Sequence, residues 1–281
     1  MGTGPKKWTE ALIAQRVKDG RGQGAGDDYL AWLYVQEFSS KGTQTRIPSM
    51  AINRTIHTFS YIERAMYLLH EFREGLLDYQ DQFPMDRRIT LGAAAGLGIR
   101  HPLYPITRVP VVMTIDAVVN RRLPNGKRSV AAWDAKPARM LKDRRTLEKL
   151  SLHKAYCAHV GIPHFVFTEL SVPKAVIRNI DWLRGSQPKA GEIESVPGLF
   201  TVHPQLMLED LWARQPKGTI RHYCTDYDKA HVWPAGTALR LIKVLLWRHQ
   251  LPVDLTAKEI ELECVPKPVA SPVAFELRRA A

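Results

Sequence analysis

The sequence contains little cysteine and no long apolar run. Its three cysteines are widely separated among 281 residues, at Cys157, Cys224 and Cys264, which argues against a disulfide framework and indicates a reducing compartment. No stretch of about 18 consecutive apolar residues occurs, and the opening MGTGPKKWTEAL lacks the apolar segment of a signal peptide. These absences exclude a small disulfide-rich secreted protein and a helical membrane protein. We expect a protein of the bacterial cytoplasm with no membrane step.

Acidic residues are scarce relative to basic ones. The chain has 40 Lys and Arg against 28 Asp and Glu, a net charge of +12 and a pI of about 9.7. Residues 201–281 hold 11 basic and 9 acidic residues, so +10 of the surplus lies in residues 1–200. Such a surplus suits a nucleic-acid partner, whose phosphates it would neutralise, but it is equally compatible with an ordinary basic protein.

The length and the hydrophobic content of 45% predict two domains. We place the first at residues 1–170, the second at 171–265 and a flexible Pro-rich tail, suited to docking a partner, at 266–281. Periodicity and turn signals predict the following elements. The first domain has helices at 8–18, 60–72 and 141–160, strands at 76–85, 109–119, 129–137 and 164–170, and a connection with a short helical piece at 89–109. The second has helices at 172–185, 204–213 and 236–250, a polar turn region between the last two, and a strand at 257–265.

Two of these strands carry charges where apolar residues are expected. Asp116 lies inside VPVVMTIDAVV, and a carboxylate there is costly to bury unless a cation or hydrogen-bond donors meet it. The next strand ends on Asp134 and Lys136, which project from one face because they are two residues apart. The turn at Asn125-Gly126 makes the two strands antiparallel neighbours, so Asp116 should meet this pair.

Glu63, at the start of the second helix, is a natural fourth member of the group. Carboxylate oxygens suit Mg²⁺ or Mn²⁺, and a neighbouring lysine can orient or deprotonate a metal-bound water and stabilise charge on a phosphate. The pattern therefore points to a phosphodiester hydrolase. Spacing alone favours a simpler role for Glu63, as the partner of Ser60 in a capping box. Asp134 and Lys136 could likewise form an exposed ion pair, and backbone or arginine donors could satisfy Asp116.

Two further patterns suggest ligands without completing a motif. Glycines at 20, 22, 24 and 26 have no preceding strand, so a flexible loop is favoured over a nucleotide-binding turn. His222, Cys224 and His231 lack the second cysteine pair of a standard zinc site. In the helix at 141–160, Leu147, Leu150 and Ala155 are expected to face inward.

Ordered blocks across residues 8–170 resemble the nuclease domain of the TnsA transposon endonucleases. They are GRGQGAGDDYLAWLYVQEFSSKGTQTRI, SYIERAM, DQFPM, GIRHP, TIDAVV, AWDAKPARMLKDRRTLEKL and GIPHFVFTEL. The resemblance implies an α/β restriction-endonuclease-like core of the PD-(D/E)xK class, a small winged-helix-like C-terminal domain and dependence on Mg²⁺, with Mn²⁺ as a substitute. It also implies cleavage of DNA at the 5′ ends of a transposon, beside a DDE-type partner transposase that acts on the 3′ ends and an AAA+ ATPase regulator.

Transferred to this chain, the family's catalytic residues fall on Glu63, Asp116 and Lys136, and its metal ligands on Glu63, Asp116 and Asp134. Asp134 is a departure, because similar proteins carry Gln or Glu there. They also place acidic residues near Ser151 and His153, so Glu148 or His153 are the candidates for a replaced accessory carboxylate. Two alternatives stay open: a catalytically silent DNA-binding scaffold of the same machinery, and a stand-alone restriction or junction-resolving nuclease.

Overall fold

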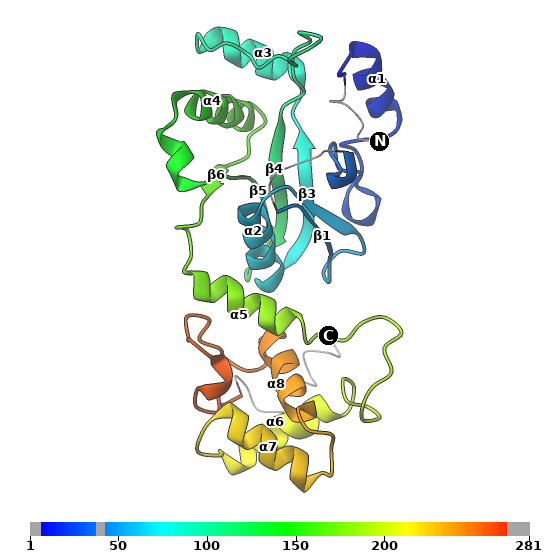
Figure 1. Ribbon diagram of the computed structural model, residues 1–281, viewed down its shortest axis with the longest axis vertical. Helices are drawn as coiled ribbons and strands as arrows, with labels where there is room; N and C mark the ends of the chain where they lie inside the picture. The colour runs from blue at the N-terminus through cyan, green and yellow to red at the C-terminus, as the bar shows by residue number, and fades with distance from the viewer. Residues whose placement is uncertain (1–6, 38–42, 269–281) are drawn as a thin grey trace. The chain divides into compact units, whose positions relative to one another are not determined.

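The computed structural model describes residues 7–37 and 43–268, and the chain forms two compact units, Met1–Ser171 and Val172–Ala281 (Figure 1). Most of the predicted tail, residues 269–281, lies outside the described part of the chain. Among the described residues, no helix is long and apolar enough to cross a membrane.

The first unit is a mixed α/β unit built on a four-stranded sheet. Its strand order is β3-β4-β5-β6, with β3, β4 and β5 antiparallel and β6 parallel to β5. β1 and β2 form a separate antiparallel pair. The predicted order of helix, three strands, helix and strand is confirmed. The elements are α1 (Glu10–Lys18), β1 (Thr45–Pro48), β2 (Thr55–Thr58), α2 (Tyr61–Phe72), β3 (Leu76–Pro84), α3 (Arg87–Gly96), β4 (Thr114–Arg122), β5 (Arg128–Ala135), α4 (Arg144–His159) and β6 (His164–Phe167).

Two sequence predictions in this unit need correction. The strand predicted from residue 109 begins at Thr114, because Val111 N–H donates to the Pro102 carbonyl and the segment before β4 pairs with a loop. In α4, Leu150 is buried but Leu147 is 45% exposed. The buried face of α4 continues instead through Leu152, Tyr156 and Cys157, which pack in one core cluster with Ile115, Val118 and Ala132 of the sheet.

The glycine-rich loop is an ordered cover on β3 rather than a flexible segment. Gly26 N–H donates to Asp78 Oδ2 at 3.0 Å, and Gln80 Nε2 donates to the Gly24 carbonyl at 3.1 Å. Gly24 has φ +86°, and a Cβ there would collide with the Asp28 carbonyl, so only glycine fits the turn. These contacts give Gly24 and Gly26 a structural role in packing the loop on β3.

The second unit is helical, with α5 (Lys174–Arg184), α6 (His203–Arg214), α7 (Ile220–Ala230) and α8 (Thr237–Trp247). α7 replaces the predicted polar turn region. Its cap is Thr219, whose hydroxyl accepts the His222 N–H, and its buried face carries Tyr223, Cys224 and Tyr227. His222 points to solvent while Cys224 is buried, and the proposed zinc ligands form no metal-binding group among the described residues.

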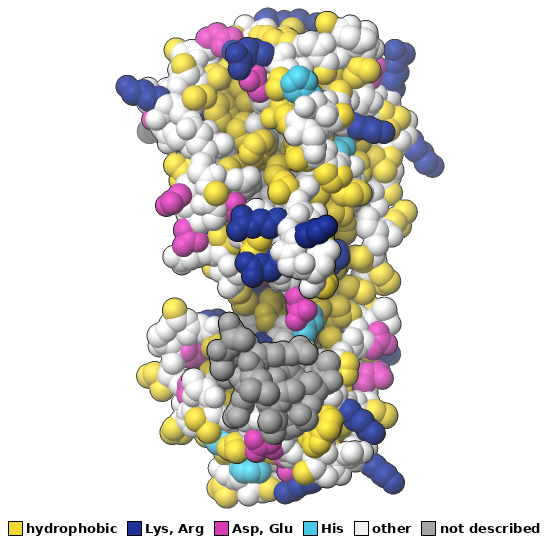
Figure 2. Space-filling view, turned by 180° about the vertical axis from the view of Figure 1, so that it is seen from behind, with side chains coloured by type: hydrophobic (Ala, Val, Ile, Leu, Met, Phe, Trp, Pro, Cys, Tyr) yellow, Lys and Arg dark blue, Asp and Glu magenta, His cyan; other side chains and the backbone are white. Residues whose placement is uncertain are grey.

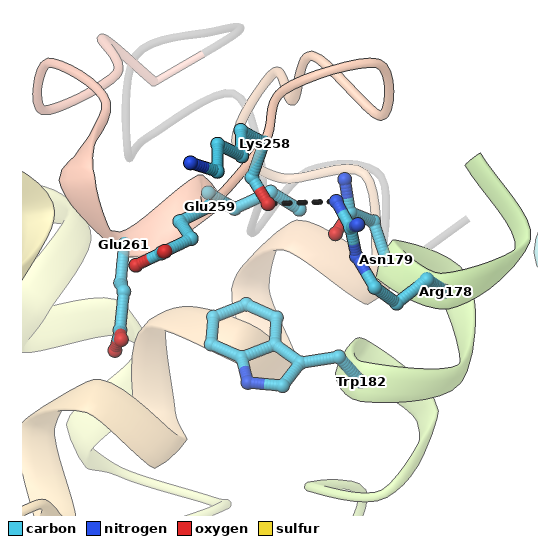
Figure 3. A pocket seen from close by; sticks show the side chains of 7 residues that line it. Arg178, Asn179, Trp182, Lys258, Glu259 and Glu261 are labelled. Atoms are coloured by element: carbon cyan, nitrogen blue, oxygen red, sulfur yellow. Dashed lines mark hydrogen bonds between the residues drawn. The ribbon is translucent and has the colours of Figure 1, made fainter. Parts of the chain in front are cut away.

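The predicted strand at 257–265 is wrong. Its beginning is held by side chains rather than by a neighbouring strand. Arg178 Nη2 donates to the Lys258 carbonyl at 2.7 Å (Figure 3). Asn179 Nδ2 donates to the Ala257 carbonyl at 2.8 Å. Only a short 3₁₀ turn at Ile260–Leu262 and one antiparallel bridge, between Thr219 and Cys264, follow.

Candidate active site

Asp116 lies on β4 opposite the end of β5 and is held by two donors. Its Oδ2 accepts the Ala135 N–H at 2.8 Å and the Lys136 ammonium at 2.8 Å. The side chain is 12% exposed, so this carboxylate in an apolar strand meets both a cation and a backbone donor. Its other oxygen, Oδ1, accepts neither of these two bonds.

Lys136 links the two aspartates of the site. Its Nζ lies 2.8 Å from Asp116 Oδ2 and 3.9 Å from Asp134 Oδ1. Burial by itself would lower the pKa of Lys136, but the charges of Asp116 and Asp134 outweigh it and raise the pKa above the usual lysine value. Lys136 is therefore a fixed ammonium in this arrangement, able to donate hydrogen bonds but not to accept a proton.

Asp134 is fully buried and is bound on one oxygen only. Its Oδ2 contacts His153 Nδ1 of α4 at 2.6 Å and His164 Nε2 of β6 at 2.7 Å. Burial would raise the pKa of Asp134, but the two histidines and Lys136 outweigh it and hold the pKa well below the usual range. Its Oδ1 has no hydrogen-bond partner in the described part of the chain.

Glu63 is both a helix cap and a member of the site. The Ser60 hydroxyl accepts the Glu63 N–H at 3.2 Å, and Glu63 Oε2 accepts the Phe59 N–H at 2.9 Å, one residue before the capping-box position. Gln82 Nε2 also donates to Oε2, at 3.3 Å. Burial and then the charge of Asp116 raise the pKa of Glu63 to about 8. The cap and the ligand roles are thus compatible in one side chain.

Two other acidic side chains, those of Glu148 and Glu71, are engaged elsewhere. Glu148 pairs with Arg144 at 3.1 Å and with Arg145 at 2.8 Å on the outer side of α4. Glu71 Oε1 accepts the Met50 N–H and the Tyr67 hydroxyl, both at 2.6 Å, and so anchors the loop between β1 and β2. Of the two candidates for an accessory group, only His153 touches Asp134.

Glu63, Asp116 and Asp134 supply oxygen ligands, although among the described residues the one group whose ligand atoms all lie within 4.8 Å of one another is Asp134, His153 and His164. Glu63 and Asp116 repel each other, Asp134 Oδ1 is a buried acceptor without a donor, and oxygen ligands of this kind suit Mg²⁺ or Mn²⁺. The cluster Asp134, His153 and His164 is a poorer metal site. Its O···N separations of 2.6 and 2.7 Å are hydrogen-bond lengths, whereas tetrahedral ligands about 2.1 Å from a zinc ion lie about 3.3 Å apart.

Sequence reasoning missed His164 as a contact of the site and left His153 undecided. The available signal was Asp134 itself, because a carboxylate at the end of a buried strand needs donors from the next elements of the chain. His164 begins β6, where it pairs in register with Ala132, two residues before Asp134 on the same face.

Clustered carboxylates and an ammonium at the end of a mixed sheet define a protein of the nuclease class, and the comparisons agree. Two family models match, one described as TnsA-like endonuclease N terminal over residues 74–169 and one as TnsA endonuclease C terminal over residues 171–255. The chain is 40% identical over 240 residues to the Transposon Tn7 transposition protein TnsA of Escherichia coli, covering 85% of this chain and 84% of that protein. The chain is a DNA endonuclease and belongs to the TnsA family of transposition endonucleases. This confirms the resemblance found in the sequence.

Proposed function

We propose that the protein is the Mg²⁺-dependent subunit of a cut-and-paste transposase that cleaves the 5′ ends of a transposon, beside a DDE-type partner transposase and an AAA+ regulator. The observation that carries this proposal is the contact of Lys136 with Asp116 at 2.8 Å, next to the unpaired Oδ1 of Asp134. The sequence relation to a Tn7 transposition protein supports the biological setting.

The first unit, in this proposal, is a restriction-endonuclease-like core of the PD-(D/E)xK class. Its support is the order α2, β3, β4, β5, α4, β6, with the charged residues at the end of β5. Glu63, Asp116 and Asp134 would hold the cation, which when bound lowers the pKa of water and polarises a phosphoryl oxygen. Mn²⁺ offers the same oxygen-ligand chemistry.

The chain's own residues then have distinct tasks. Lys136, as a fixed ammonium, donates to the phosphate oxygens and stabilises the negative charge that grows on them. Asp116 orients that ammonium and accepts the Ala135 N–H, which ties the end of β5 to β4. Glu63 is placed by the start of α2, and Gln82 of β3 holds its Oε2.

For the second unit we propose a winged-helix-like role in contacting DNA or protein partners. Three successive helices, α6 to α8, support it, together with the bridge between Thr219, before α7, and Cys264, after α8. Ile220 N–H donates to the Glu263 carbonyl at 2.9 Å and Val265 N–H to the Gly218 carbonyl at 3.1 Å. This is where the first strand of such a domain would pair.

The test is a strand-resolved cleavage assay. The protein is incubated with DNA carrying transposon ends, with and without the partner transposase and ATPase, in Mg²⁺, Mn²⁺ or EDTA, and nicks are mapped on each strand. We expect nicks at the 5′ ends that require metal and partners. Cleavage of plain duplex without partners would instead support a stand-alone restriction or junction-resolving nuclease. Binding without nicks in any metal would support a silent scaffold.

A further inference from the structure

Asp134 has an asymmetric environment. One carboxylate oxygen, Oδ2, lies within hydrogen-bond distance of two imidazole nitrogens, while Oδ1 has no hydrogen bond within the described ranges and faces Lys136 at 3.9 Å. A buried carboxylate normally distributes its donors over both oxygens, because each unpaired polar atom in an apolar interior costs free energy. Asp134 Oδ1, which has no donor in the part of the chain described and lies near the Lys136 ammonium, is therefore the oxygen of this carboxylate that would bind a metal ion.

The two imidazoles reach Asp134 from separate elements. His153 comes from the buried face of α4, and His164 from the first position of β6, beside β5. Both are nearly buried, with side chains 8% and 6% exposed, and their rings lie edge to face at 6.2 Å. A helix and a strand thus fix the carboxylate from two directions, which leaves its plane little freedom to turn.

We propose that His153 and His164 are positioning residues of the nuclease site, which clamp Oδ2 of Asp134 so that Oδ1 alone is presented to the metal beside Lys136. This rests on the proposed function, in which Asp134 is a metal ligand. Because the Asp134 side chain is fully buried, its orientation is set by the groups that contact it. Hydrogen bonds to a ligating carboxylate typically change metal affinity or activity by about 10–100-fold when removed.

The donors define matched variants. His153 uses Nδ1, which the amide nitrogen of asparagine approximates in position, and His164 uses Nε2, which that of glutamine approximates. H153N and H164Q therefore keep the donor where it is. H153Q and H164N keep an amide but displace it by one bond, and H153A and H164A remove it. H159A, on the exposed end of the same helix, is the control.

The measurement is the Mg²⁺ requirement, read both from half-maximal nicking and, without cleavage, from half of the metal-induced rise in melting temperature, on variants shown by circular dichroism to be folded. We expect it to rise about tenfold in H153A and H164A and to rise clearly in H153Q and H164N, but to stay within about twofold of wild type in H153N, H164Q and H159A. If H153A and H164A fail to fold, H153Q and H164N test the proposal, because they keep an amide donor but displace it by one bond. An unchanged Mg²⁺ requirement in folded H153Q and H164N would overturn the proposal.

A double-variant cycle separates this proposal from the proposed function. In the D134N background there is no carboxylate to orient, so adding H153A or H164A should not raise the Mg²⁺ requirement further, here read from the metal-induced rise in melting temperature because D134N is itself expected to lose nicking. An equal rise in both backgrounds would show that the histidines act through general stability and would overturn the clamp. If the wild type nicks DNA equally well in EDTA, the proposed metal-dependent function fails instead.

Discussion

Asp116 accepts hydrogen bonds from the Ala135 N–H and the Lys136 ammonium. Substitutions at Asp116 should therefore separate the effect of its negative charge from the effect of its hydrogen bonds. D116N keeps an acceptor for the Ala135 N–H but loses the negative charge that would hold a cation and Lys136. We expect D116N to fold with a melting temperature within a few degrees of wild type and to lose nicking. D116A should lose nicking and also about 1–3 kcal/mol of stability, because the buried Ala135 N–H is left without an acceptor. Nicking by purified D116N would contradict the site.

Glu63 should make the stability of the metal-free protein depend on pH. Its folded pKa of about 8 lies above its ordinary value of 4.5, so the folded state holds the proton more tightly than the unfolded state. The associated stability is fully present below about pH 4.5 and is lost as the pH rises through about 8. Because one pKa unit corresponds to about 1.4 kcal/mol, the loss is on the order of a few kcal/mol.

The glutamine in E63Q carries no titrating proton, so comparing E63Q with wild type isolates the contribution of Glu63 ionisation to stability. In EDTA, the melting temperature of E63Q relative to wild type should increase from pH 5 to pH 8, because all other titrating groups are shared. At the same time E63Q should lose most nicking, since a neutral amide binds Mg²⁺ poorly. If the melting temperatures of E63Q and wild type changed with pH in parallel, ionisation of Glu63 would not destabilise the fold. If E63Q nicked DNA at the wild-type rate, Glu63 would be only a helix cap.

For single residues, the sequence predicted that Asp116, Asp134 and Lys136 lie together, but it did not predict the hydrogen bonds that hold Asp134. Asp116, Asp134 and Lys136 were brought together from strand alternation and one turn signal, both of which are local rules. The role of Ser60 was also local and is seen in the structure, although Glu63 accepts from Phe59. The hydrogen bonds from His153 and His164 depend on how a helix and a parallel strand pack, which no short-range pattern encodes.

Among the elements, α1 is attached through a buried arginine. The Arg16 guanidinium donates to both carboxylate oxygens of Glu37, at 2.9 and 2.7 Å, and to the Trp32 carbonyl, and it lies 5.0 Å from the Trp8 ring centroid. We expect R16M to cost about 2–4 kcal/mol in thermal or urea unfolding, because it removes one partner of a buried bidentate pair.

A surface pair on the same helix supplies the control. Arg87 Nη2 contacts Glu10 at 2.7 Å, but the Glu10 side chain is 59% exposed. E10A should therefore change the free energy of unfolding by about 1 kcal/mol or less. Similar losses for R16M and E10A would show that α1 is not anchored by its buried arginine.

The errors at the level of elements have physical causes. α7 is rich in polar residues, yet Tyr223 and Tyr227 repeat one turn apart behind the Thr219 cap, a signal that reading by polarity overlooked. The predicted strand at 257–265 had the right composition, but the carbonyls of its first two residues accept from Arg178 and Asn179, which lie 80 and 78 residues earlier in the chain. Hydrogen bonds from side chains so distant in sequence replace strand pairing here, and local strand propensity cannot predict them.

For the whole molecule, the charge surplus of residues 1–200 predicts salt-sensitive DNA binding. Lys and Arg side chains lie at many places on the face drawn in Figure 2. In the first unit a hollow of about 460 Å³ is lined by Arg100, Arg108 and Arg145 and also by Glu148, which pairs with Arg145. Within the described parts of the chain, Arg100 and Arg108 have no acidic partner, so they are available to phosphates.

We expect the logarithm of DNA affinity to fall linearly with the logarithm of salt concentration, measured by fluorescence anisotropy. The double variant R100A/R108A should lower the magnitude of the slope by about 2, since each phosphate contact contributes about one. K127A/R128A removes the same charge from the exposed turn between β4 and β5 and the first residue of β5, outside the hollow, and serves as the control. An equal change in both double variants would show that net charge, rather than this hollow, governs the salt dependence.

The position of the partners of Asp134 along the chain has a consequence for synthesis. Its two histidines lie 19 and 30 residues further on, so His153 can reach it only once α4 packs on the sheet, and His164 only once β6 pairs with β5. A nascent chain that has emerged only as far as Lys136 already contains every carboxylate of the centre, yet nothing that can bury Asp134. The arrangement around Asp134 can therefore form only once β6 has been synthesised, and the last strand of the sheet acts as the checkpoint.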